Sequence, residues 1–147
     1  MTSSSSFSAL ECRVGLGRMS VATDAIDMLA EYPVGARLPL TDRISYSIGV
    51  WQDDVVLSVS LAPLDGAPPG RTTTGLLLVT PGTAIRWAFE IVASVGLVEI
   101  ASLNKPQSAA MRWLRTATLS HGGPIQFVDI RALIGDLDSL AGERLAW

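Results

Sequence analysis

The chain has 147 residues, close to the commonest size of a single domain, and charged residues make up only 17% of it. The net charge is −3, and Lys105 is the one lysine. The chain therefore lacks the clustered cations that nucleic-acid binding requires. A single cysteine, Cys12, excludes an intrachain disulfide, so we expect a cytoplasmic protein.

Hydrophobic residues make up 48% of the chain. The one apolar stretch of membrane length, 84–103, contains Arg86, Glu90 and Glu99, and each charge near a bilayer centre costs about 2.5–3.5 kcal/mol. We therefore expect no membrane span. The low charge predicts instead that part of the apolar surface is covered by a partner or a second copy, or lines a pocket.

The N-terminal region begins with a serine-rich stretch, 1–8, which is predicted to be a flexible tail without a secretory signal. Residues 9–147 are predicted to form one globular domain. Residues 9–16 fit a strand, and apolar residues at helical spacing predict a helix that starts at Ser20 or Thr23 and ends at the next proline.

Two alternating segments, 43–51 and 55–61, predict a β-hairpin. Serines line one face of it. That face is interpreted as the solvent side of an antiparallel sheet, with a polar ligand groove as the alternative. Residues 62–71 are rich in proline and glycine and read as a loop, after which 72–80 is predicted to be a third strand.

The segment that follows is predicted to be the centre of the fold. A strand at 76–79 is followed by a helix from Pro81 to Gly96 and by a buried strand beginning at Leu97. Polar residues recur along this helix every four positions, at Arg86, Glu90 and Ser94. One long helix over 82–103 is the alternative.

The C-terminal third is predicted to add a helix, a strand and a helix. Asn104 caps a helix that ends before His121, because Pro106 suits a first turn and small and apolar residues follow at helical spacing. Residues 125–130 fit a strand, and 132–147 fit a helix.

This order predicts an α+β domain: a mixed, largely antiparallel sheet with an N-terminal meander, and helices packed mainly on one face. A wound α/β arrangement of residues 72–147 is the alternative. Over residues 20–103 the predicted order resembles that of small acidic secretion chaperones, which are α+β dimers, and it departs from them after Leu103.

No complete catalytic motif is present. A lone histidine excludes a metal site built from several imidazoles, and no carboxylate spacing fits a calcium loop, so no metal is expected. Residues 14–20 resemble the start of a dinucleotide-binding fingerprint, but Ser20 replaces the third glycine, so a turn is favoured and no cofactor is expected.

Two functions remain open. The first is a non-catalytic interaction module, such as an adaptor, inhibitor, immunity protein or chaperone, that acts as a homo-oligomer or with a protein partner. Its interface candidates are the aromatic residues Trp51, Trp147 and Tyr46.

The second is a small-molecule-binding domain or cofactor-free enzyme. Its pocket would lie between the sheet and a helix and use three residues capable of acid or base chemistry, His121, Asp129 and Glu99, with Tyr46 beside them.

Overall fold

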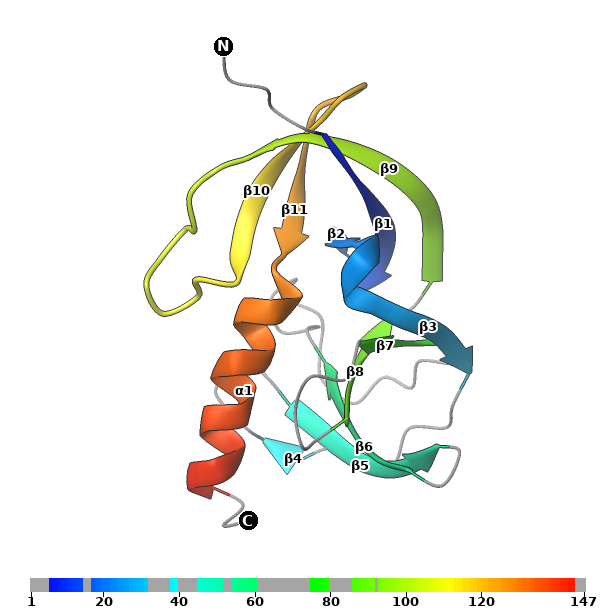
Figure 1. Ribbon diagram of the computed structural model, residues 1–147, viewed down its shortest axis with the longest axis vertical. Coiled ribbons are helices and arrows are strands. Elements are labelled where there is room, and N and C mark those ends of the chain that lie inside the picture. The colour runs from blue at the N-terminus through cyan, green and yellow to red at the C-terminus, as the bar shows by residue number, and fades with distance from the viewer. Residues whose placement is uncertain are drawn as a thin grey trace.

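The computed structural model describes residues 6–14, 17–31, 38–39, 45–51, 54–60, 75–79, 86–91 and 93–144. These ranges hold eleven strands, one short 3-10 turn and one α-helix. Figure 1 shows a small barrel above, a second sheet below, and the helix descending from the barrel beside that sheet.

The barrel is closed and contains five strands in the order β1-β2-β11-β10-β9. Neighbouring strands are antiparallel except β2 and β11, which run parallel with Ser20 opposite Phe127. The strand bounds are β1 Phe7–Val14, β2 Gly17–Ala22, β9 Ala93–Leu103, β10 Leu114–Leu119 and β11 Pro124–Val128. The barrel therefore contains strands from the N-terminal part and from the C-terminal part of the chain.

The second sheet is formed by the chain between β2 and β9. Its six strands follow the order β3-β7-β8-β6-β5-β4, and β6 and β8 are its one parallel pair among the described strands. The turn η1, Thr23–Ala25, leads into it. The strand bounds are β3 Ile26–Glu31, β4 Leu38–Pro39, β5 Ser45–Trp51, β6 Asp54–Ser60, β7 Gly75–Val79 and β8 Arg86–Ile91.

Helix α1, Ile130–Arg144, links the barrel to the sheet. Leu133 and Leu137 on this helix are fully buried. The indole nitrogen of Trp87, on β8, donates a hydrogen bond of 2.8 Å to Oδ1 of Asp138. No helix within the described ranges has both the length and the apolar character needed to cross a membrane.

Two hydrophobic clusters fill the interior. The smaller lies within the barrel and contains Ala9, Ile100, Ala117, Ile125 and Phe127. The larger is shared by barrel, sheet and helix, and its biggest members include Met19, Leu57, Trp87, Phe89, Trp113, Leu133 and Leu137. Because this cluster takes side chains from all three parts, burial of apolar surface holds them together.

The predicted α+β fold with helices on one face of a mixed sheet is wrong, because strands dominate the described chain and a closed barrel replaces the predicted layers. The alternative of a wound α/β arrangement for residues 72–147 is wrong for the same reason. Barrel strands β9, β10 and β11 form an antiparallel meander without intervening helices.

The predicted helix from Pro81 to Gly96 instead contains β8 and the start of β9, and the long helix over 82–103 is excluded with it. A spacing of four residues is a multiple of two, so a polar stripe at that interval fits one face of a strand as well as a helix. Trp87, Phe89 and Ile91 are residue types that favour strands.

Two other predicted helices are also strands. The helix from Ser20 or Thr23 is the end of β2, the turn η1 and β3, while the helix after Asn104 is an irregular segment followed by β10. The likeness to secretion chaperones depended on these helices and is lost with them.

The predicted hairpin is confirmed, with β5 and β6 paired antiparallel, and so are the strands at 9–16, 76–79 and 125–130 to within a few residues. The helix near the C-terminus is confirmed as α1. The prediction that the serine face of the β5–β6 hairpin is the solvent side is wrong: Ser47 and Ser58 are buried, whereas Ile48 is exposed. The Ser58 hydroxyl donates to the Ser47 carbonyl at 3.3 Å.

Candidate functional site

Two of the three predicted acid–base residues meet at the upper end of the barrel. Glu99 lies on β9, and His121 follows β10 in the turn to β11. The backbone N–H of Ser120 donates to the Glu99 carbonyl at 2.9 Å. Hydrogen bonds from the Ser120 and Ser6 hydroxyls lower the pKa of Glu99, with a smaller contribution from the charge of His121.

Asp129 lies at the opposite end of β11. Its backbone N–H donates to the Trp113 carbonyl at 2.7 Å, and its carboxylate caps helix α1 by accepting from the Ala132 N–H at 3.3 Å. Asp129 is five positions beyond Pro124 along β11, which corresponds to about 16 Å at 3.3 Å per residue. The structure therefore does not bring Asp129 to His121 and Glu99.

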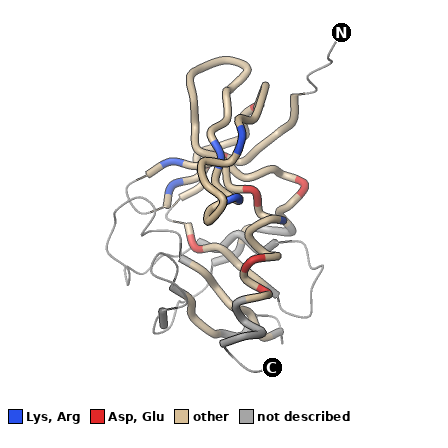
Figure 2. The backbone as a smooth tube through the Cα atoms, turned by 90° about the vertical axis from the view of Figure 1, so that its left-hand side faces the viewer, with Lys and Arg blue, Asp and Glu red and all other residues tan. Residues whose placement is uncertain are grey.

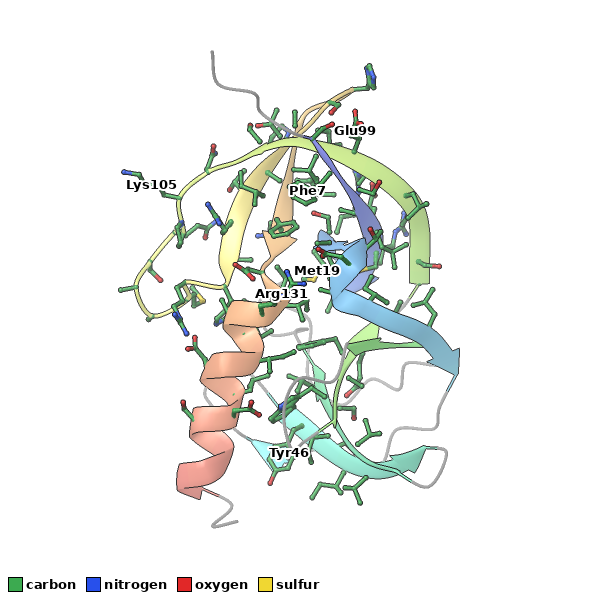
Figure 3. All side chains as sticks on the ribbon, in the orientation of Figure 1. Phe7, Met19, Tyr46, Glu99, Lys105 and Arg131 are labelled. Carbon is green, nitrogen blue, oxygen red and sulfur yellow. The ribbon has the colours of Figure 1, made fainter. Side chains whose placement is uncertain are left out.

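Figure 3 shows the same separation among the labelled residues: Glu99 lies at the top of the barrel, Arg131 at its junction with α1, and Tyr46 in the lower sheet. Tyr46 is buried at 7% exposure and belongs to the large core cluster. It is therefore a core residue within this chain and is not part of the polar group around Glu99.

A pocket of about 330 Å³ opens where the barrel meets the first turn of α1. Its lining is mainly apolar, with charged side chains from η1 and α1. The lining residues are Phe7, Ser8, Ala22, Thr23, Asp24, Ala25, Leu103, Phe127, Asp129, Ile130 and Arg131. Of the predicted site residues, only Asp129 contributes to this pocket.

Two of the residues that line this junction pocket form an aromatic pair. The rings of Phe7 and Phe127 are 5.6 Å apart between centroids and inclined at 77°, an edge-to-face arrangement. The sequence placed Phe7 in a flexible tail, but β1 begins with it. Its apolar character in a serine-rich stretch was the signal for this position.

The other predicted interface residues fall partly outside the described structure. Trp51 ends β5, but its side chain is outside the described set, and Trp147 lies outside the described residues. The sequence missed a different surface on β9, where Val95 and Leu97 are 53% and 72% exposed. This segment was predicted to be buried because it is apolar.

The described residues supply little for metal or covalent chemistry. Within these ranges no group of three or more His, Cys, Asp or Glu side chains is placed to hold a metal ion. Cys12 is buried in the core. In Figure 2 the basic positions of the described part lie mainly across the middle of the view, and the acidic positions lie mainly beside and below them.

Comparison with protein-family models and with curated proteins finds no match for this chain.

Proposed function

We propose that this protein is a non-catalytic interaction module, of the adaptor, inhibitor, immunity or chaperone-like kind. It works as a homo-oligomer or bound to a protein partner, in the cytoplasm, and binds neither nucleic acid nor a membrane. A lone, buried cysteine fits a reducing compartment. Trp51 and Trp147 remain predicted members of its interface.

The observation that carries this proposal is an exposed, uncharged stretch at the start of β9, residues 93–97. All five residues are exposed, and Leu97 is the most exposed large apolar side chain in the described structure. Exposed apolar side chains that lie close together on a soluble protein are typical of contact sites. We define residues 93–97 as the β9 patch.

The strand pairing explains why the β9 patch is uncovered. Glu11 pairs with Gly96 and Cys12 with Ser94, so Val95 is the extra residue of a β-bulge. Strand β10 pairs with β9 only from Ile100 onward. Among the described strands, the patch therefore has β1 on one edge and no strand on the other.

The first test is whether the chain associates through this patch. We expect the wild-type protein to self-associate with increasing concentration in sedimentation velocity, or to retain a specific protein from lysate of its host. Leu97→Lys should weaken either association at least about tenfold, because a lysine at a desolvated apolar contact costs more than 1.4 kcal/mol.

The matched control is Leu29→Lys, which makes the same substitution at a leucine that is 49% exposed on β3. It should leave association unchanged. A wild-type chain that remains monomeric at millimolar concentration and retains no protein would contradict the proposed function. If both variants weaken association equally, the β9 patch is not the contact site of the proposed interaction module.

The second candidate function is binding of a small molecule, and the junction pocket favours it. Its volume lies at the lower end of the range for ligand sites, roughly 300–1,000 Å³, and an apolar floor with a few polar groups at the rim is the usual composition of such sites. Saturation-transfer NMR with small aromatic probes tests this candidate.

A further inference from the structure

The charges and aromatic rings of the junction pocket point to a chemical class of ligand. We propose that it binds a small primary amine whose aryl or alkyl body lies against Phe7 and whose ammonium group is held by Asp129. This inference rests on the second candidate function, the binding of a small molecule.

The apolar part of the pocket is built mainly from four elements, β1, β9, β11 and α1. Phe127 and Ile130, at the end of β11 and the start of α1, are buried at 5% and 3% exposure. Phe7 and Leu103 are half-buried at the sides. Phe7 meets Phe127 edge to face, which leaves an aromatic surface beside the pocket for the body of a ligand.

The charges around the pocket leave one carboxylate in excess. Arg112 is paired with Asp136 at 2.8 Å, and Arg131 is paired with Asp24 at 3.7 Å. The pKa of Arg112 is raised chiefly by its hydrogen bond to Asp136, with Asp129 contributing least. Each arginine thus has its own acidic partner, and Asp129 makes the lining net negative.

Asp129 keeps capacity to accept further hydrogen bonds. An ionised carboxylate has about four lone-pair sites, and helix capping by the Ala132 N–H uses one on Oδ1. A primary ammonium group donates three hydrogen bonds and is attracted to the face of an aromatic ring within about 6 Å. Asp129 and Phe7 together therefore match a cation attached to an apolar body.

The test uses 2-phenylethylamine, with neutral 2-phenylethanol and anionic 3-phenylpropionate as matched probes, and follows amide shifts of the wild-type chain by NMR. We expect shifts at Leu103, Phe127 and Ile130, with the amine at least about tenfold tighter than the alcohol because its hydrogen bond is charge-assisted. Asp129→Asn should remove that tenfold advantage and leave the alcohol unchanged. Asparagine is also a good helix cap, so α1 is preserved.

Glu99→Gln is the control, because it removes one negative charge at the other end of the barrel. It should leave binding of the amine unchanged. If none of the three probes shifts the pocket residues, this inference and the second candidate function both fall. If all three bind equally, or if Glu99→Gln weakens the amine as much as Asp129→Asn does, only the assignment to amines is overturned.

Discussion

At the scale of single residues, hydrogen bonding sets the charge state of Glu99 more than burial does. Its carboxylate is solvent-exposed, and hydroxyl donors from Ser120 and Ser6 favour the ionised form. A carboxyl group whose pKa is lowered in the folded state stabilises the fold above its unfolded pKa. That contribution is lost as the pH falls through the folded pKa, which lies below the ordinary value of a glutamate.

Ser120→Ala should therefore raise the pKa of Glu99 toward its ordinary value. Carboxyl carbon NMR titration of the folded protein measures this directly. Ser8→Ala is the control, since Ser8 lies opposite Glu99 on β1 but its hydroxyl does not contribute to the lowered pKa. A Glu99 pKa that does not change in Ser120→Ala would show that the main hydrogen bond is assigned to the wrong donor.

At the scale of elements, the turn between β10 and β11 depends on a backbone conformation that only glycine adopts readily. Gly122 has φ of +148°, and an added Cβ would lie 3.3 Å from Cδ1 of Leu119. This turn positions His121 beside Glu99 and sets the register of Leu114 opposite Val128.

Gly122→Ala should reduce the free energy of unfolding by about 1–3 kcal/mol, the usual cost of a strained backbone conformation. Gly123→Ala is the matched control, because an added Cβ there meets no atom within 4 Å. It should change stability by less than about 1 kcal/mol. Urea denaturation followed by circular dichroism compares the two, and equal effects would argue against strain at Gly122.

Sequence spacing located most elements but often misjudged their type. Alternation in the β5–β6 hairpin fixed both strands, because a period of two has no helical equivalent. The segments around Trp87 and Trp113 are mostly apolar, interrupted by polar residues such as Arg86 and Arg112. Such runs fit a buried helix and a doubly covered strand equally well, and only the neighbouring strands decide between them.

At the scale of the whole molecule, the barrel closes by joining β2 to β11 and β1 to β9, which lie far apart in the chain. The second sheet is formed by the part of the chain between β2 and β9. Because the large core cluster includes Met19 from the barrel, Phe89 from the sheet and Leu133 from α1, the parts share buried surface. Loss of any one part exposes the apolar side chains of the others.

The barrel and sheet should therefore unfold together. Fluorine-labelled tryptophan allows Trp113 in the barrel region and Trp87 in the sheet to be followed separately during urea denaturation. We expect coincident midpoints, and Leu137→Ala should move both down together while lowering the free energy of unfolding by about 2–5 kcal/mol. Two separated midpoints in the wild-type chain would contradict a shared core.

The candidate sites show the same limit of sequence reasoning. Asp129, Glu99 and His121 were grouped as residues capable of acid or base chemistry, but Asp129 follows β11 at the end of that strand away from His121. No sequence pattern pairs Phe7 with Phe127, since these residues meet only when the barrel closes. The β9 patch is visible only once β1 and β10 are placed beside it.

The sequence by itself determined the apolar excess, the low charge, the lone cysteine, the β5–β6 hairpin and the helix near the C-terminus, because each depends on composition or local periodicity. Tertiary structure alone decided that the three other segments predicted to be helices contain strands, that β1, β2, β9, β10 and β11 build one barrel, and where the pocket and the β9 patch lie. Strand pairing forms hydrogen bonds between residues that are distant in the sequence. The local spacing of apolar residues does not indicate which strands will pair.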